Sequence, residues 1–586
     1  MTTPPPRNAA PSPRLAWASL VAAVAAAALW YHWPQVGAWP LLLGLAPWPV
    51  ARRLPPRSPA HIPLFAFTLT AAVSLGAAYD PATAWAKFWL IIGGWLLFTA
   101  LVALHQAGLV RQAAWLLAAL GAVVSLYFLC TNDWDSYPTK IAMLVDVGRV
   151  LRRWMPAFPG HPLHPNVVGG LLGMSLPFAA TTVWSNQGWR RAGGAGLLFF
   201  SLVGLLFTAS RGAWAALAGA ALLIGGWQLA GWVSRRRSLP RRWLMLGGLC
   251  LSASLALAFL LFGAPAWGRL LAALPGPNST LSRLDLYRGS LSLAADYPLV
   301  GAGLGSFPLL YASYSLLVHV GHSIHAHNLW LDVAIEQGGF GVLALGWLVA
   351  LAGISVWRMA ADEQLPATLA AGALSLTTIL AHGMVDDAFY GSRALLLLFA
   401  PLAFVLADPR PRQRRQSRRR LAAALLLALL ALLPWQRQPR ALAWRNFAAA
   451  RQSRIELTVY QWPDWPLQDA VRRAVDLSQP IAAYERALAL DPANASANRR
   501  LGQIELSLGD YDRALAHLQA AYAAAPSNNA TRQLLGEAII VTGGVDAGTT
   551  LWAGINQAQG QLALRAFWYE HLGDEQRLAW VHEAMR

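Results

Sequence analysis

Residues 278–341 read NSTLSRLDLYRGSLSLAADYPLVGAGLGSFPLLYASYSLLVHVGHSIHAHNLWLDVAIEQGGFG, and long apolar segments flank this stretch on both sides. The stretch contains two arginines near its start and four histidines near its end: Arg283, Arg288, His319, His322, His325 and His327. Charged groups are costly inside hydrocarbon and are usually functional when they lie within a membrane protein. We therefore expect a polar loop that carries the chemistry, held at a membrane surface by the apolar segments.

The composition is that of a polytopic membrane protein. The 586 residues are 56% hydrophobic and only 13% charged, whereas a soluble protein carries about 25% charged residues. The formal net charge of +18 comes almost wholly from arginine, since the only lysines are Lys87 and Lys140. The arginines lie in short clusters between apolar runs, which indicates topology signals and argues against a nucleic-acid partner.

Apolar runs long enough to cross a bilayer, about 20 residues, recur along the chain. They predict thirteen membrane-spanning segments near residues 15–33, 36–50 (short), 61–79, 84–104, 110–130, 165–184, 192–210, 212–233, 243–264, 328–356, 366–385, 392–408 and 421–435. With the N-terminus in the cytoplasm, the strong basic clusters all fall inside, as the positive-inside rule requires. These clusters are Arg52/Arg53/Arg57, Arg190/Arg191, Arg235 to Arg242, Arg358 and the run ending at Arg420.

The C-terminal part repeats with a period of 34 residues. Pro492 and Pro526 are one such pair, and Leu501 and Leu535 are another. The unit LGQIELSLGDYDRALAHLQAAYAAAP, which begins at Leu501, matches the tetratricopeptide pattern. Such repeats normally bind partners, although a role as a simple cap on the membrane domain remains an alternative.

The predicted organisation is therefore all-α. It has a cytoplasmic tail (1–14), a transmembrane domain (15–435) with a large periplasmic loop (265–327), a linker (436–479) and a repeat domain (480–586). The odd number of spans places the loops 131–163 and 265–327 and the repeats on the exterior, which in a bacterium is the periplasm.

His327 is the candidate catalytic residue. It lies at the exterior mouth of a predicted span, where Asn328 can cap the first helical turn. Gly338 and Gly341 allow a second helix to approach closely. A histidine in such a wet position titrates near neutrality and can take a proton from a hydroxyl group. The alternative is an interfacial histidine that only bonds a carbonyl group, and His325 has a supporting role at most.

Three exterior arginines are candidates for binding phosphate: Arg211, Arg283 and Arg288. Arginine on the exterior runs against the topology bias, and guanidinium groups bind phosphate bidentately, so a diphosphate head group would suit them. The alternative is simple ion pairing with nearby acids, for which Asp285, Asp296, Asp332 and Glu336 are available.

Other polar positions give weaker signals. His164 opens a predicted span and lines the cavity or caps the helix. Asp332 and Glu336 either orient His327 or an arginine, or are solvated. A further exterior turn carries His382, Asp386, Asp387 and Arg393, for which a local ion-pair network is the plainer account. The pattern of cysteines and histidines indicates no metal site.

The motifs resemble those of the O-antigen ligase family. The resemblance rests on His327-Asn328 followed by nine residues, Gly338, two residues and Gly341, and on SRGAW (210–214), HPN (164–166) and SRLDLYRG…YPLVGAGLGSF (282–307). It covers roughly residues 60–410, and the C-terminal repeats depart from it. The superfamily also includes O-antigen polymerases and bacterial protein O-oligosaccharyltransferases. The resemblance implies an all-helical membrane bundle with a large periplasmic loop. It also implies His327 as the essential histidine and Arg211 and Arg283 as diphosphate-binding residues, with a weaker claim for Arg288 and His325.

The function implied is transfer of a glycan from undecaprenyl diphosphate to an acceptor hydroxyl, on lipid A-core or on a protein, at the periplasmic face of the bacterial inner membrane. The resemblance implies no metal and no other cofactor, and direct attack would invert the anomeric configuration. The expected partners are the lipid-linked donor, the acceptor, membrane lipids and a protein bound by residues 480–586. An O-antigen or exopolysaccharide polymerase shares this machinery. A lipid-linked glycan flippase and a non-catalytic scaffold are alternatives of other classes.

Overall fold

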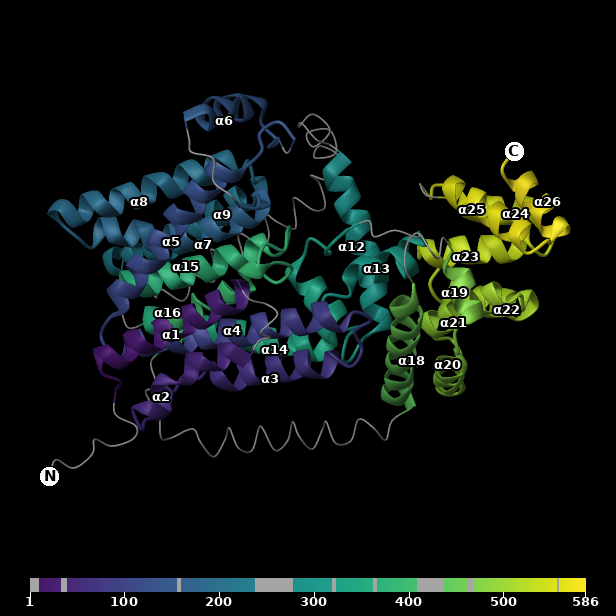
Figure 1. The fold of residues 1–586 in the computed structure, drawn as a ribbon, viewed down its shortest axis with the longest axis horizontal. Helices are drawn as coiled ribbons and strands as arrows, with labels where there is room; N and C mark the ends of the chain where they lie inside the picture. Colours follow the sequence, from purple (N-terminus) through teal and green to yellow (C-terminus); the bar gives the residue numbers. More distant parts are fainter. Residues whose placement is uncertain are drawn as a thin grey trace.

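The computed structural model describes residues 10–32, 39–136, 138–154, 160–237, 278–318, 323–361, 366–407, 437–460, 467–555 and 558–586, and every regular element in these ranges is a helix. A bundle of apolar helices forms one end of the molecule and the C-terminal repeats form the other (Figure 1). The predicted all-α class is thus confirmed for the described residues.

Six helices in the described ranges are long and apolar enough to cross a membrane. They are α1 (Pro13–His32), α4 (Pro81–Gln106), α5 (Val110–Thr131), α7 (Pro165–Trp184), α8 (Gly188–Phe207) and α14 (Leu329–Ala361). Shorter apolar helices lie among them, namely α3 (His61–Ser74), the first part of α9 (Arg211–Arg237) and α15 (Ala367–His382). The finding supports a multi-pass membrane protein.

Several of the thirteen predicted spans differ from single long helices. The predicted short span 36–50 is divided between η2 (Trp39–Leu45) and α2 (Pro47–Val50), and the one at 392–408 between η4 (Arg393–Leu397) and α16 (Leu402–Val405). The predicted spans 243–264 and 421–435 lie outside the described residues, as does the basic run that ends at Arg420. The count of thirteen therefore stays a prediction.

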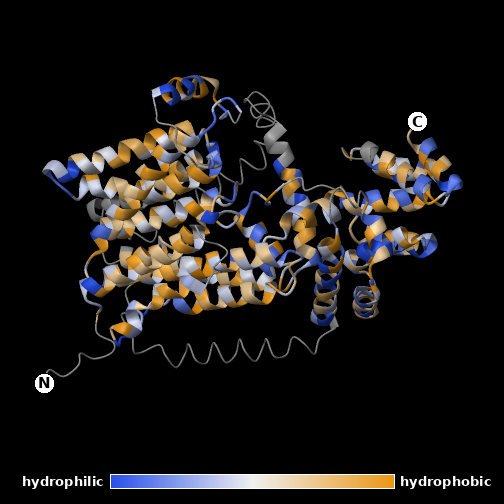
Figure 2. Cartoon of the chain, in the orientation of Figure 1, coloured by the Kyte–Doolittle hydropathy of each residue, from blue (hydrophilic) through white to orange (hydrophobic). Residues whose placement is uncertain are grey.

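The outer surface of the bundle is apolar. Large exposed side chains include Phe65 on α3, Val123 on α5, Phe199 on α8 and Leu343 on α14. Figure 2 shows hydrophobic residues all along these helices. A soluble protein rarely exposes so much contiguous apolar surface, so these faces suit contact with lipid.

Small residues allow the central helices to pack closely. A Cβ atom at Gly121 of α5 would overlap Ser175 of α7, and one at Gly204 of α8 would overlap Ser125 of α5. Helices in a membrane associate through such close contacts because hydrocarbon supplies no hydrophobic drive between them.

The helix that follows the histidines is broken at Gly338. This residue has φ +71° and ψ −170°. The loop at residues 298–303 crosses the break and forms backbone hydrogen bonds with it: Gly339 N–H donates to the Pro298 carbonyl (2.9 Å) and Ala302 N–H donates to the Ile335 carbonyl (2.8 Å). The loop thereby satisfies groups that the helix itself leaves unpaired.

The predicted exterior loops contain helices of their own. The loop 131–163 contains α6 (Ala142–Trp154), and the loop 265–327 contains α12 (Asn278–Asp296), α13 (Phe307–Tyr311) and the short π-helical segment η3 (Ala312–Leu316). In Figure 1, α12 and α13 lie between the bundle and the repeats.

The C-terminal part is an array of helix pairs. The elements are α18 (Arg437–Val459), α19 (Gln468–Ala474), α20 (Ser478–Leu490), α21 (Ala495–Leu508), α22 (Tyr511–Ala524), α23 (Asn529–Ile540), α24 (Val545–Trp552), α25 (Ala558–His571) and α26 (Glu575–Ala584). Residues 436–479, expected to be a linker, instead include α18 and α19. The reason is that α18 buries Ala448 and Ala449 in the same core as Ala483 and Ala487 of α20.

We predict that Gly338→Ala destabilises the protein, whereas Gly346→Ala on the same helix does not. At Gly338 the added Cβ would overlap the Leu299 carbonyl and the positive φ would be strained, which together cost more than about 2 kcal/mol. At Gly346 a Cβ meets nothing within 4 Å. The measurement is the midpoint of thermal unfolding in detergent, and equal midpoints for the two variants would contradict the role given to Gly338.

Candidate functional site

The loop before α14 is anchored by Asn328, as predicted. The Asn328 side-chain oxygen accepts hydrogen bonds from the backbone N–H groups of Trp330 (3.0 Å) and Leu331 (3.2 Å) and so caps the first turn. Its amide group donates to the Met384 carbonyl (3.0 Å). The cap therefore fixes the histidine loop at the start of α14 and ties it to the turn after α15.

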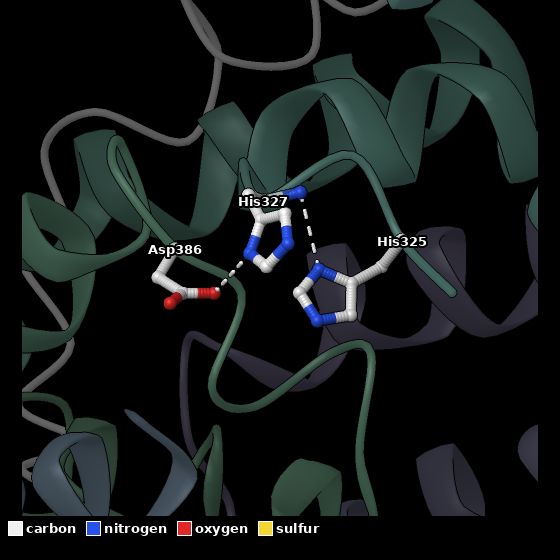
Figure 3. Close-up of side chains that lie close together, drawn as sticks. All are labelled: His325, His327 and Asp386. Carbon is white, nitrogen blue, oxygen red and sulfur yellow. Dashed lines mark hydrogen bonds and ion pairs between the residues drawn. The ribbon is translucent and has the colours of Figure 1, made fainter. Parts of the chain in front are cut away.

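His327 is held by a carboxylate that is distant in the sequence. Its Nδ1 lies 2.8 Å from Oδ1 of Asp386, which follows α15 (Figure 3). The backbone of His327 has φ +51°, and its carbonyl accepts a hydrogen bond from the Tyr287 hydroxyl (3.1 Å). Because a carboxylate only accepts, we assign the proton to Nδ1, which leaves the Nε2 lone pair available.

Asp386 joins three parts of the fold. Besides His327, it accepts a hydrogen bond from the side-chain amide of Asn166 on α7, and Nη2 of Arg283 on α12 lies 3.6 Å away. Burial would raise the pKa of Asp386, but the hydrogen bond and the charge of His327 hold that pKa well below its usual range. The carboxylate therefore remains ionised at any pH near neutrality.

Close packing brings the relevant helix ends together. His382, the last residue of α15, packs against two glycines near helix starts. A Cβ at Gly170 of α7 would lie 3.2 Å from Nδ1 of His382, and one at Gly212 of α9 would lie 3.3 Å from its Cδ2. The starts of α7, α9 and α14 and the end of α15 thus meet at one place.

Arg283 lies beside this carboxylate, and two further cations, Arg211 and Lys140, are near enough to act on one another electrostatically. Arg211 is the first residue of α9, and Arg283 lies on α12. Lys140, in the segment before α6, is their neighbour. Partial burial, and then the charges of Arg283 and Arg211, lower the pKa of Lys140, while Asp386 acts in the opposite direction. The site therefore has an excess of positive charge suited to an anion.

His325 supports the loop and has a different character from His327. Its Nδ1 accepts a hydrogen bond from the backbone N–H of His327 (3.1 Å), and the two rings lie 4.2 Å apart between centroids. Burial, and then the neighbouring His327, lower the pKa of His325 to about 4. It is therefore neutral near neutral pH and acts as a hydrogen-bond acceptor within the loop.

Buried acids lie beneath the histidines. Asp332 is not solvated: its Oδ1 accepts a hydrogen bond from the backbone N–H of Ala326 (2.7 Å), between the two histidines. Its carboxyl group neighbours that of Asp387, whose pKa is raised to about 6 by burial. Glu336 pairs with Lys87 of α4 (2.7 Å). Of these acids, Asp332 bonds the loop directly.

Not every predicted residue joins the cluster. Arg288 pairs with Asp285 on its own helix (3.3 Å), and its side chain is 78% exposed. His164 caps α7, since its Nδ1 accepts from the backbone N–H of Asn166 (3.2 Å). Burial lowers the pKa of His164 while the nearby Asp386 raises it, so His164 does lie near the site. His319 and His322 lie outside the described residues.

Sequence reasoning assigned no site role to three of these residues: Asn166, Lys140 and Asp386. It placed Asp386 in a local ion-pair network, whereas the residue contacts His327, 59 positions away. The HPN motif was the available signal for Asn166. For Lys140 the signal was its rarity, since the chain has only two lysines.

His325, His327 and Asp386 could also hold a metal ion, because one ligand atom of each lies within 4.8 Å of the others. His327 Nδ1 and Asp386 are, however, joined directly by a hydrogen bond, and His325 Nδ1 accepts the His327 amide. A metal would have to replace at least one of these bonds.

Comparison with known families identifies two segments. Residues 196–346 match the O-antigen ligase family, and residues 472–529 match the tetratricopeptide repeat family. The first segment includes Arg211, Arg283, His325 and His327, and the second includes α20 and α21. Both matches agree with the families suggested by the motifs. No curated protein and no solved structure matches the chain.

Proposed function

We propose that this chain, which carries an O-antigen ligase domain and tetratricopeptide repeats, is a membrane glycosyltransferase that moves a glycan from undecaprenyl diphosphate to an acceptor hydroxyl. The observation that carries the proposal is the pairing of His327 with the buried carboxylate of Asp386, which lies 3.6 Å from Arg283. A general base next to an anion-binding cluster is what glycosyl transfer from a diphosphate requires.

His327 is the base in this proposal. Asp386 orients the ring and stabilises the imidazolium that forms, so Nε2 can accept the proton of the acceptor hydroxyl. The acceptor oxygen attacks the anomeric carbon as its O–H bond breaks. The bond from that carbon to the diphosphate oxygen breaks at the same time, and its electron pair leaves with the diphosphate. A single displacement of this kind inverts the anomeric configuration.

The cations stabilise the leaving group. Arg211 and Arg283 bind the diphosphate bidentately, and Lys140 adds a point charge. Because negative charge develops on the diphosphate in the transition state, this electrostatic contribution is the larger one. The cations occupy the role that a divalent metal plays in other phosphate sites, so the proposed reaction needs no metal.

The position of the site favours transfer over transport. The reacting groups come from the starts of α7, α9 and α14 and from the turn after α15, so they gather at one end of the bundle. A flippase would be expected to place charged groups along a path through the bilayer. We propose that this end and the repeats face the periplasm and that the chain lies in the bacterial inner membrane. Polymerisation of a glycan uses the same chemistry and differs only in the acceptor.

We predict that His327→Ala and Asp386→Asn each lower glycan transfer by about 100-fold or more, because they remove the base or its orienting partner. Binding of the lipid-linked donor should persist in His327→Ala. The matched control is Asp285→Asn, which changes an exposed carboxylate on α12. His325→Ala should retain more activity than His327→Ala.

The measurement is transfer from purified undecaprenyl-diphosphate glycan to lipid A-core, glycan and protein acceptors, with donor binding followed separately. Transfer should continue with excess chelator. Near-normal transfer by His327→Ala, or complete loss with chelator, would remove the proposed mechanism.

We predict that Arg211→Lys and Arg283→Lys lower transfer roughly ten- to a hundredfold, because an ammonium group cannot reproduce the bidentate contact, worth about 1.5–3 kcal/mol. Arg288→Lys is the matched comparison and should be close to wild type, since Arg288 is exposed and pairs with Asp285. The measurement is the rate of transfer at saturating donor. Equal effects at all three positions would mean that the arginines act only through net charge.

The proposed orientation predicts that a thiol on the repeats is accessible from the periplasm. A cysteine at exposed Ala516 of α22, in a variant without the two natural cysteines, should react with a membrane-impermeant reagent in intact spheroplasts. The position faces solvent, so the residue itself does not limit labelling. Reaction only after the membrane is ruptured would reverse the topology.

A further inference from the structure

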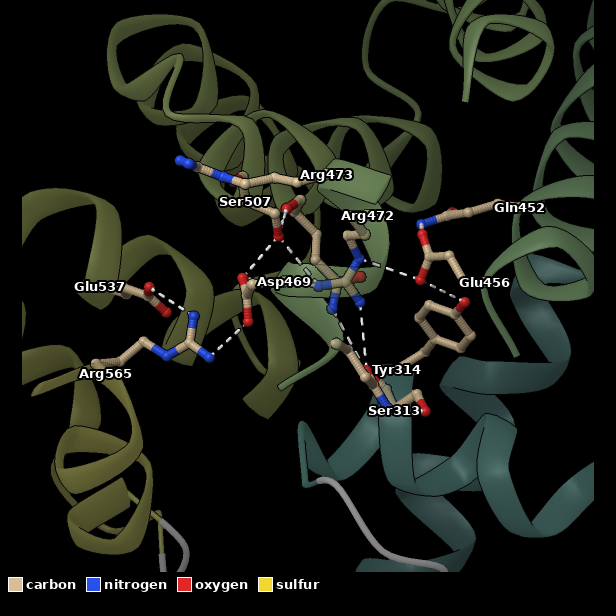
Figure 4. A network of polar contacts seen from close by, with 12 residues as sticks. Ser313, Tyr314, Gln452, Glu456, Asp469, Arg472, Arg473, Ser507, Glu537 and Arg565 are labelled. Carbon is tan, nitrogen blue, oxygen red and sulfur yellow. Dashed lines mark hydrogen bonds and ion pairs between the residues drawn. The ribbon is translucent and has the colours of Figure 1, made fainter. Parts of the chain in front are cut away.

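The repeat domain grips a segment of its own chain that leads to the histidine loop. This segment, residues 296–318, will be called the gripped segment; it contains Asp296 at the end of α12 and Tyr314 in η3. Figure 4 shows the η3 residues Ser313 and Tyr314 beside Glu456 of α18 and Arg472 of α19. The contacts between the gripped segment and these helices are buried and include several charged groups, so they are more specific than ordinary apolar packing between two domains.

The first contact is a buried ion cluster. The side chain of Asp296 is fully buried, and Nη2 of Arg499 on α21 lies 2.7 Å from both of its oxygens. Arg500 Nε lies 3.1 Å away, and the Ser496 hydroxyl also donates to this carboxylate. Burial would raise the pKa of Asp296, but the charges of Arg499 and Arg500 hold that pKa below its usual value. Removing the arginines would leave a buried charge unpaired.

The second contact is made by Tyr314. Its hydroxyl donates to Oε2 of Glu456 on α18 (2.9 Å), and its carbonyl accepts from Nη1 of Arg499 (2.9 Å). The Arg500 guanidinium lies 3.4 Å from the centre of its ring. Arg472 of α19 in turn pairs with Glu456 (3.1 Å). The hydroxyl group, the carbonyl group and the ring of Tyr314 are therefore all in contact with charged side chains.

Apolar packing continues from the repeats to the histidines. Tyr297, Phe307 and Tyr314 belong to one buried cluster with Tyr484 and Leu501 of the repeats. The same cluster includes Ala326, the residue between His325 and His327, and Ile335 of α14. Part of the core of the repeats, from α20 and α21, therefore belongs to the same apolar cluster as the residue between the two histidines.

We propose that the repeat domain is an internal clamp that positions the histidine loop, with Arg499 and Arg500 as positioning residues. Repeats of this kind ordinarily hold an extended segment of a partner. Here α21 directs Arg499, Arg500 and Gln503 at the gripped segment of the same chain. On α21, the surface that would bind a partner is occupied by the gripped segment of the same chain. We infer that any protein partner binds elsewhere on the repeats.

The test compares Arg499→Gln with Arg513→Gln in the full-length protein. Arg513 of α22 is the matched control, because its ion pairs among the described residues are all with acids of the repeats, namely Glu485, Glu505 and Asp510, and its side chain is 56% exposed. Amide hydrogen exchange is followed in nanodiscs for residues 312–318 and 323–328. The Val318 and Ala326 amides are useful reporters, since they donate to the Ala312 carbonyl and to Asp332.

Arg499→Gln should raise the rate of amide hydrogen exchange at least tenfold in residues 312–318 and 323–328, while the amides of α23 and α24 keep their protection. Arg513→Gln should leave both stretches unchanged. Unchanged protection of residues 312–318 and 323–328 in Arg499→Gln would overturn the clamp. If Arg499→Gln loses protection throughout the repeats, Tyr314→Phe provides the deciding measurement, because it removes only the hydrogen bond to Glu456. Faster amide exchange limited to residues 312–318 and 323–328 supports the clamp, and unchanged exchange refutes it.

The kinetic consequence rests on the proposed function. Arg499→Gln should lower kcat at least tenfold with unchanged donor binding, whereas Arg513→Gln should match wild type. Amide hydrogen exchange is measured without substrates. The clamp can therefore be refuted without refuting the proposed function, and the reverse also holds. Wild-type protein that transfers no glycan would refute the proposed function only. Altered exchange with unchanged kcat would show that the grip does not position the reacting groups, and would overturn the clamp.

Discussion

The arrangement of the site depends on one buried carboxylate. Asp386 accepts from His327 and from Asn166 and lies beside Arg283, so it connects the loop before α14 with α7 and α12. A buried anion is stable only when donors and positive charges surround it, which forces these elements to converge. The same requirement fixes the orientation of the imidazole ring. The Asp386 carboxylate therefore determines both the position of the site residues and the charge around His327.

Much of the architecture follows from local sequence patterns. Apolar runs of about 20 residues indicated α4, α5 and α7 with nearly correct boundaries, because length and hydropathy are properties of the segment itself. The 34-residue period indicated the repeats for a similar reason. Asn328 was predicted to cap a helix and does so. His327, Arg211 and Arg283 were identified from motifs, and His327 and Arg283 both contact or approach Asp386.

The partners of charged residues could not be obtained in the same way. Asp296 was considered as a partner for the loop arginines, but it pairs with Arg499, 203 positions later. Asp285, in contrast, does pair with Arg288, one helical turn away. Local pairs are limited by helix geometry, whereas distant pairs depend on how the helices pack. For the same reason, the contact between His327 and Asp386 could not be predicted from the sequence. The sequence also predicted a linker where α18 lies, because the alanines of α18 are buried by packing against α20, which is a tertiary contact.

The break at Gly338 has a consequence for the height of the site above the hydrocarbon. The part of α14 after the break, residues 339–361, is about 34 Å long at 1.5 Å per residue, enough by itself to cross a hydrocarbon core of about 30 Å. The first part, residues 329–337, need not enter the lipid, which explains how it accommodates Asp332 and Glu336. If only the second part crosses the hydrocarbon, the first part holds His327 up to about 14 Å from it, more than the thickness of one headgroup layer. Under the proposed function, this placement would let a water-soluble acceptor reach His327 without entering the bilayer.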